Sequence, residues 1–140
     1  MHSDWYIYWW RVGKNTIERL AHLIAFDTTS RLSNLALIDD TANYLHGMGA
    51  KPWLAYNEQG TKANLFATIP AANGSVEGGL ILSGHTDVVP TDGQNWQSDP
   101  YQADIRDGKL YGRGSADMKG FIASVLTAAP RKMRAKPKRT

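Results

Sequence analysis

The stretch LILSGHTDVVP, residues 80–90, decides the expected fold. It begins with the apolar run Leu80-Ile81-Leu82, and we expect residues 80–83 to form a strand buried on both faces of a parallel sheet. The run leads to His85 and Asp87, which lie two residues apart and therefore point to the same side of an extended backbone. Because ligands gather at the carboxyl ends of strands in open α/β sheets, these side chains mark a candidate site. An imidazole and a carboxylate there favour a divalent metal such as zinc.

A second stretch, GRGSADMKG at residues 112–120, places another carboxylate in a glycine-rich turn. This carboxylate, Asp117, precedes an apolar segment that predicts a helix over residues 119–129, ended by Pro130. Side chains at the ends of such elements can converge on one ion. Lys119 beside the glycines raises phosphate binding as an alternative, but the sequence has no Gly-Lys-Ser/Thr pattern of the Walker type.

Spacing alone leaves the roles of these residues open. A histidine after a strand is more often a satisfied core or loop residue, and an aspartate in a glycine-rich turn usually bonds the backbone. Asp87 is either a second metal ligand or the hydrogen-bond acceptor that fixes the tautomer of His85. His22 and His46 have no acidic partner at ligand spacing, and His2 lies in an unusual N-terminus, so all three receive a structural interpretation.

The periodicity of the remaining chain indicates helices and short strands. A first helix is predicted with Asn15 as its cap and with Ile17, Leu20, Ala21 and Ile24 facing inward. A second helix is predicted from residue 33 or 34 to 47, with Leu35, Ile38, Ala42 and Leu45 facing inward. The remaining predicted elements are a hairpin of 53–56 and 65–69, a polar loop over 91–108, and a strand over 109–111. Helices before and after buried strands indicate an α/β fold, a three-layer αβα domain.

Composition divides the chain into an atypical aromatic N-terminal extension, residues 1–14, a domain over 15–130, and a basic tail over 131–140. The extension holds the run WYIYWW, which is far shorter than the ~20 apolar residues of a membrane span and lacks a signal-cleavage site. An interfacial aromatic anchor is the alternative for it. The tail holds six basic residues and no acid, so that without it the formal charge of +3 becomes −3. Nucleic-acid binding by the tail is a minor alternative, since such binding needs a patch on a fold.

Length and composition are those of one folded domain. The 140 residues, 42% of them hydrophobic, are enough for a core. The chain has no cysteine, which excludes disulfides and thiolate metal sites within it. We expect a cytoplasmic location, with which this composition is compatible.

The motifs together resemble the dinuclear zinc amidohydrolases and exopeptidases. The resemblance is carried by residues 82–90, the loop 96–101 and residues 112–120, within a similarity over roughly 16–136. Three features favour those members of the family that act on N-acetylornithine: the stretch AFDTTS at residues 25–30, the stretch KANLFAT at residues 62–68, and the serines Ser83 and Ser115 within the two motifs.

This resemblance implies a set of roles and a reaction. His85 would bind one of two zinc ions, Asp117 would bridge both, and Asp87 would orient His85; cobalt is an expected substitute. The bond between Asp117 and Met118 would be cis. The reaction would be hydrolysis of an N-acyl amino acid, N-acetylornithine in arginine biosynthesis being favoured over N-succinyl-diaminopimelate. The implied partner is this small-molecule substrate, with neither nucleic acid nor membrane, and the parent protein would be a homodimer. A non-catalytic binding module with a vestigial metal site is the alternative of another class.

The general base of this family is a glutamate that follows the next strand of the fold, together with further ligands. Residues 118–140 contain no Glu, Asp or His. We therefore expect the chain to be the N-terminal part of such a catalytic domain, without the general base and without the lid and dimerisation domain, and to be inactive by itself. Substrate-binding residues are not assigned.

Overall fold

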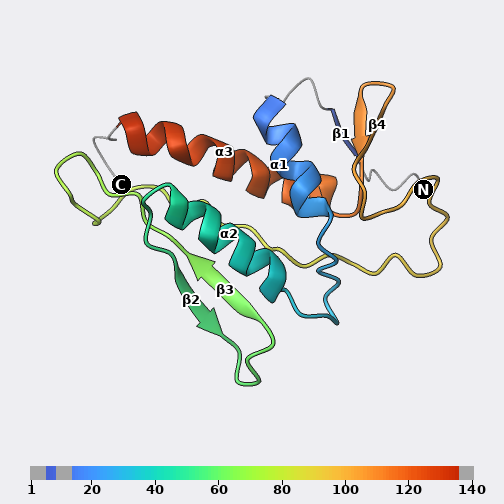
Figure 1. The fold of residues 1–140 in the computed structure, drawn as a ribbon, viewed down its shortest axis with the longest axis horizontal. Coiled ribbons are helices and arrows are strands. Elements are labelled where there is room, and N and C mark those ends of the chain that lie inside the picture. Colours follow the sequence, from blue (N-terminus) through green and yellow to red (C-terminus); the bar gives the residue numbers. More distant parts are fainter. Residues whose placement is uncertain (1–5, 9–13, 136–140) are drawn as a thin grey trace.

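The described part of the chain forms three main helices and two small antiparallel sheets. A computed structural model describes residues 6–8 and 14–135 (Figure 1). The elements in chain order are β1 (Tyr6–Tyr8), α1 (Lys14–Ile24), α2 (Leu35–Gly47), β2 (Trp53–Tyr56), β3 (Ala63–Phe66), β4 (Asp104–Arg106), β5 (Lys109–Tyr111), the short π-helical turn η2 (Ser115–Lys119) and α3 (Gly120–Ala135). The mixed helix and strand content agrees with the predicted α/β class.

The core lies where α1 and α3 meet, with α2 packed beside them. Its buried apolar side chains come mainly from the three helices and from β5; they are Leu20, Leu23, Ile24, Leu37, Leu45, Ala50, Leu110, Ala123 and Leu126. The hydroxyls of Thr16 and Thr127 join α1 to α3 at 2.8 Å. Figure 1 shows α2 between α3 and the hairpin of β2 and β3. No helix in the described part of the chain is long and apolar enough to cross a membrane.

The predicted parallel strand over residues 80–83 is wrong for this structure. These residues have no strand assignment, and Leu80 and Ile81 are 77% and 79% exposed. A parallel strand takes its hydrogen bonds and its cover from neighbouring strands, and within residues 6–8 and 14–135 no strand pairs with this segment. A single parallel bridge, between Thr29 and Val88, follows it. The three-layer arrangement is therefore not seen among the described residues.

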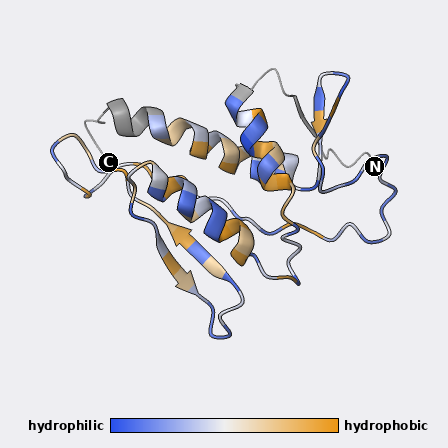
Figure 2. Ribbon diagram, viewed as in Figure 1, coloured by the Kyte–Doolittle hydropathy of each residue, from blue (hydrophilic) through white to orange (hydrophobic). Residues whose placement is uncertain are grey.

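Two antiparallel hairpins replace the expected sheet. β2 and β3 pair with Trp53 opposite Phe66, and β3 begins and ends earlier than the predicted 65–69. Figure 2 shows hydrophobic residues along both strands, although Trp53 and Phe66 are 65% and 55% exposed. The second hairpin joins β4 to β5, and β1 pairs with the other edge of β5. The strand over 109–111 is thus confirmed.

β4 was missed because the whole of residues 91–108 was interpreted as a loop. Asp107 and Gly108 both have positive φ, 50° and 69°, and connect β4 directly to β5. An Asp-Gly pair between extended residues is a strong hairpin signal, since both central residues of a type I′ turn need positive φ. This signal was present in the sequence and would have located the strand.

The start of α1 and the end of α3 differ from the predicted helix boundaries. α1 begins at Lys14, so Asn15 lies inside it and is not a cap. The predicted inward residues Leu20 and Ile24 are buried, as expected. α3 continues through Pro130, which was expected to end it. The proline nitrogen has no hydrogen to donate to the Leu126 carbonyl, and the hydroxyl of Tyr44 lies 3.5 Å from that oxygen instead.

α2 is confirmed as a helix. Its buried face differs in part from the predicted one, and the residue before its first turn makes tertiary contacts. Asn34 makes no side-chain cap hydrogen bond. Its amide instead accepts from the Ala63 backbone N–H at 3.0 Å and donates to the Ala63 carbonyl at 2.9 Å, which docks the helix on β3. The buried residues are Leu37, Ile38, Thr41 and Leu45, rather than Leu35, Ile38, Ala42 and Leu45. The stripe therefore faces α1 and the core through Leu37.

The proposed division of the chain stays a prediction. Residues 6–8, within the expected N-terminal extension, form β1, whereas residues 1–5 and 9–13 lie outside the described residues. The first half of the basic tail, residues 131–135, continues α3. The second half, residues 136–140, also lies outside the described part.

Candidate metal centre

The segment around His85 is held by the loop that follows α1. Val88 donates its backbone N–H to the Thr28 carbonyl at 3.1 Å, and its carbonyl accepts from the Ser30 N–H at 3.0 Å. The Thr28 hydroxyl donates to the Thr86 carbonyl at 2.6 Å. Loop residues 28–30 therefore pair with residues 86–88 as a neighbouring strand would, and this fixes the backbone on the C-terminal side of His85.

Two glycines let the surrounding elements come close to this segment. A Cβ on Gly84 would lie 3.2 Å from side-chain atoms of Met118 and Phe121, so the chain runs directly against the start of α3. Gly114 has a φ of +79°, and a Cβ there would lie 2.7 Å from Val88. A side chain at Gly114 is excluded both by its conformation and by Val88, whereas a side chain at Gly84 would require Met118 and Phe121 to shift by a few tenths of an ångström.

These contacts bring together the three residues that the sequence singles out. The Nε2 of His85 lies 2.9 Å from Oδ1 of Asp117. On the other side of the ring, Nδ1 lies 3.0 Å from the Asp87 carbonyl and 3.1 Å from its Oδ1. The side chains of His85, Asp87 and Asp117 are 48%, 54% and 79% exposed, so the cluster opens to solvent. The expected approach of Asp117 to the ring is confirmed, as is the cis bond between Asp117 and Met118.

The surroundings of His85 and Asp87 favour the charged form of each side chain. Partial burial acts most strongly on His85 and lowers its pKa, but hydrogen bonds to the Asp87 carbonyl and the Asp117 carboxylate, with the charges of both carboxylates, outweigh it and raise the pKa above its ordinary value. The pKa of Asp87 is lowered, first by the hydrogen bond from the Ser30 hydroxyl at 2.7 Å. The carboxylate of Asp87 is therefore ionised at neutral pH.

Lys119 lies beneath the cluster and serves the fold. Its side chain is completely buried, and its Nζ donates to the Phe26 carbonyl at 2.7 Å. Burial lowers the pKa of Lys119 to about 8, partly offset by the charge of Asp27. The ammonium group thus ties the turn η2 to the end of α1, and it is turned away from any phosphate outside the protein.

Arg113 anchors the segment that leaves the site. It is 1% exposed, and its Nη2 donates to the Gln94 side chain and lies 3.4 Å from the Pro90 carbonyl. Its guanidinium also lies 5.1 Å from the centre of the Trp96 ring. Sequence reasoning assigned no role to Arg113 or Ser30, and it considered Lys119 only as a possible phosphate ligand. The partners of Arg113 and Lys119 are distant from them in sequence, so the sequence alone does not reveal that these charged side chains are buried.

Neither His22 nor His46 joins the cluster, and His2 lies outside the described residues. His22 on α1 lies 2.8 Å from Oδ1 of Asp40 on α2, and its ring meets Phe26 edge to face, so its structural interpretation agrees with the fold. His46 is exposed in the last turn of α2. Among residues 6–8 and 14–135, no group of three or more His, Cys, Asp or Glu side chains has the arrangement to hold a metal ion. The described cluster therefore offers two converging donors, His85 and Asp117, with Asp87 behind the ring.

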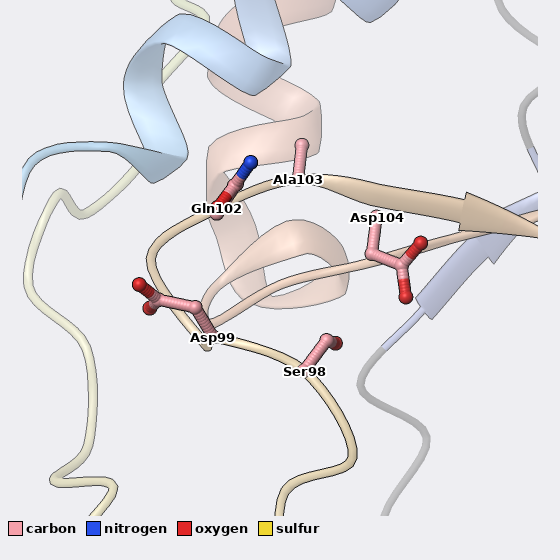
Figure 3. A pocket seen from close by; sticks show the side chains of 5 residues that line it. All are labelled: Ser98, Asp99, Gln102, Ala103 and Asp104. Atoms are coloured by element: carbon pink, nitrogen blue, oxygen red, sulfur yellow. The ribbon is translucent and has the colours of Figure 1, made fainter.

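A cavity of about 320 Å³ lies elsewhere, in the loop that precedes β4 (Figure 3). It is lined by Ser98, Asp99, Gln102, Ala103 and Asp104, and by none of the three clustered residues. Its two carboxylates are engaged: Asp99 accepts from the Tyr101 backbone N–H, and Asp104 pairs with Arg106. The cavity volume is therefore a poor guide to the chemistry of this chain, and the His85 cluster is the better candidate site.

Comparison with known proteins gives a consistent family. Residues 81–140 match the sequence profile of peptidase family M20/M25/M40. The chain is 43% identical over 119 residues to acetylornithine deacetylase of Pasteurella multocida, and 45% identical over 105 residues to that of Proteus mirabilis. These matches cover 80% and 74% of this chain but only 30% and 26% of the relatives. The resemblance drawn from the sequence motifs is therefore confirmed.

A solved structure shows the same fold. Human carnosine dipeptidase 1 superposes with a TM-score of 0.58 at 22% sequence identity, over 87% of this chain and 29% of that one. At this identity the likeness concerns the fold alone. The chain spans less than a third of the length of each of these proteins.

Proposed function

We propose that this chain supplies part of the metal centre of a zinc-dependent amidohydrolase that cleaves N-acyl amino acids. The observation that carries the proposal is the distance of 2.9 Å between Nε2 of His85 and Oδ1 of Asp117, with Nδ1 of the same ring turned to Asp87. In this proposal His85 and Asp117 would be metal ligands, Asp117 would be shared by two ions, and Asp87 would orient His85. The expected fold of the whole domain is the three-layer αβα arrangement.

The donor set fits zinc as a part of a site. An imidazole nitrogen and a carboxylate oxygen are ordinary zinc ligands, and two ligands of one ion at ~2 Å each lie about 3 Å apart, as these two atoms do. The exposure of Asp117, 79%, leaves its carboxylate accessible to a second ion. The described residues hold no third converging ligand, so the remaining ligands and the general base would come from outside this set.

Each residue then has a defined task. Asp87 accepts the Nδ1–H of His85 and leaves the Nε2 lone pair directed to the side of Asp117. Asp117 contributes negative charge beside that nitrogen. Bound zinc would supply Lewis-acid polarisation of the scissile carbonyl and would lower the pKa of a water towards ~7. The half-exposed position of His85 leaves this edge open to a small substrate.

The substrate we propose is N-acetylornithine, cleaved to ornithine and acetate in arginine biosynthesis, in a cytoplasmic, homodimeric enzyme. Its support is the similarity to the relatives named acetylornithine deacetylase at 42–45% identity. N-succinyl-diaminopimelate is the second candidate, because it presents a similar acyl amide to the same groups. The two differ at the non-reacting end, where binding decides relative kcat/KM.

Metal binding by the 140-residue chain tests the site directly. We expect isothermal titration with Zn²⁺ to show weak binding that His85→Ala abolishes. His46→Ala is the matched control, since it removes an exposed histidine away from the cluster. Binding that survives His85→Ala, or that His46→Ala removes equally, would refute the assignment.

Activity tests the reaction. We expect the 140-residue chain alone to be inactive on N-acetylornithine in the presence of zinc. We expect activity from a longer protein in which this chain is extended by the natural coding sequence beyond codon 140. Faster turnover of N-succinyl-diaminopimelate would reject the substrate but keep the reaction class. Absence of zinc-dependent turnover in that longer protein would favour a binding module with a vestigial site.

A further inference from the structure

The Ser30 hydroxyl contacts the cluster from outside the proposed ligand set. We propose that Ser30 is a positioning residue of the metal centre: its hydroxyl fixes the carboxylate of Asp87, which in turn fixes the ring of His85. The inference rests on the proposed function, since it concerns the same site. It assigns to Ser30, in the loop after α1, a task that the family resemblance did not imply.

The two oxygens of the Asp87 carboxylate are held from different residues. Oδ2 accepts from the Ser30 hydroxyl at 2.7 Å, and Oδ1 lies 3.1 Å from Nδ1 of His85. The terminal torsion of an aspartate is broad, so a carboxylate bonded through one oxygen alone can turn. The second hydrogen bond removes this freedom and sets the plane in which Asp87 meets the ring.

Ser30 is itself fixed by its backbone. Its N–H donates to the Val88 carbonyl at 3.0 Å, and its own carbonyl accepts from the ammonium group of Lys62. The hydroxyl has one other acceptor within reach, the Val88 carbonyl at 3.3 Å. Asp87 is the better acceptor because it is closer and charged. The hydroxyl therefore reaches the carboxylate from an anchored position.

The consequence for His85 is a preferred tautomer. A neutral imidazole carries one N–H, and the nitrogen without it is the one that can bind a metal. Nδ1 faces two oxygens of Asp87, the backbone carbonyl at 3.0 Å and Oδ1 at 3.1 Å, whereas Nε2 faces one oxygen of Asp117 at 2.9 Å. While Ser30 holds the Asp87 carboxylate, its two acceptors together favour the proton on Nδ1 and leave the Nε2 lone pair for a metal. Without the Ser30 hydroxyl the carboxylate can turn away, only the backbone carbonyl remains at Nδ1, and Asp117 competes more effectively for the proton at Nε2.

The tautomer can be measured without metal. In the 140-residue chain labelled with ¹⁵N-histidine, at a pH where the imidazole is neutral, long-range ¹H–¹⁵N spectra should show mainly the Nδ1–H form of His85. Ser30→Ala should shift the population towards Nε2–H. Ser33→Ala is the matched control: it removes a nearby exposed hydroxyl that donates to the Thr61 carbonyl, and it should leave the spectrum unchanged. An unchanged tautomer ratio in folded Ser30→Ala overturns the proposal.

A second pair of variants and a second readout keep the test decisive. Ser30→Thr retains the hydroxyl, whereas Ser30→Val has a side chain of the same volume without it. If Ser30→Ala does not fold, a difference in the His85 tautomer ratio between these two variants supports the proposal, and equal ratios overturn it. Zn²⁺ affinity should fall roughly tenfold in Ser30→Ala and Ser30→Val and be retained in Ser30→Thr, as for other groups that orient a ligand. Zinc binding that does not depend on His85 would refute the proposed function, whereas the metal-free tautomer ratio would still decide the role of Ser30.

Discussion

Residues 80–83 and residues 84–88 are adjacent in sequence but differ in how they are anchored to the rest of the fold. Leu80 and Ile81 are more than three-quarters exposed, and within the described residues no strand pairs with them. Val88, in contrast, is 3% exposed, and its backbone hydrogen bonds run to the loop after α1. Gly84 packs directly against α3. The segment is therefore anchored only from Gly84 onward.

This difference shows what holds the candidate site. The apolar run that leads to His85 makes no sheet contact here, yet His85 still meets Asp117 at 2.9 Å. The geometry depends on the pairing of loop 28–30 with residues 86–88 and on the turn η2 that Lys119 ties to α1. The contacts between loops, rather than a sheet, position the cluster in this chain.

The largest expected effect comes from closing the space between the turn and Val88. Gly114→Ala should lower the free energy of unfolding by about 3 kcal/mol, from overpacking against Val88 and from the strained positive φ of +79°. Gly93→Ala is the matched control, since Gly93 has a φ of +70° but nothing within 4 Å of its added Cβ, and it should cost about 1 kcal/mol. Urea unfolding followed by circular dichroism measures both. Equal losses in the two variants would show that the turn does not pack tightly on Val88.

A smaller effect should separate the two halves of the segment directly. Val88→Ala removes buried methyl groups and should cost about 2 kcal/mol of unfolding free energy. Ile81→Ala, at a side chain that is 79% exposed, should cost less than about 0.5 kcal/mol. The same unfolding measurement compares them. A larger loss for Ile81→Ala would mean that residues 80–83 are covered in solution and would restore the predicted buried strand.

The sequence predicted the parts of this structure that depend on local residue order. The stripe of α1, the hairpin from Trp53 and the strand at Lys109 follow from periodicity and turn residues within a few positions. The approach of Asp117 to His85 spans 32 positions and was predicted from the resemblance of two motifs. Spacing alone did not distinguish that pair from ordinary loop residues.

The parts that were missed depend on partners distant in sequence. The exposure of Ile81 follows from which strands lie beside it, and an apolar run does not specify its neighbours. Pro130 was expected to end α3, but Tyr44 from α2 approaches the carbonyl that the proline leaves without a donor. Ser30 belongs to the stretch AFDTTS, which supported the family resemblance but gave the serine itself no role. Its contact with Asp87 spans 57 positions and has no local signature.

The smallest expected effect concerns the pH dependence of the loop that holds residues 86–88. Burial acts most strongly on Asp27 and raises its pKa, but hydrogen bonds from the Thr29 hydroxyl at 2.6 Å and backbone N–H at 2.9 Å, with a contribution from Tyr101, outweigh it and lower the pKa below its ordinary value. A carboxyl group with a lowered pKa in the folded state stabilises that state above the unfolded pKa of ~3.9, and this stabilisation is lost as the pH falls through the folded pKa. Asp27→Asn should therefore reduce stability at pH 7 by less than about 1 kcal/mol, because the side chain is exposed and screened. The variant should also flatten the loss of stability between about pH 5 and pH 2. Asp39→Asn removes an exposed carboxylate of α2 and serves as the control in the same series of urea titrations. If Asp39→Asn flattens the curve as much as Asp27→Asn, the acid sensitivity arises from the overall charge, and the loop does not carry it.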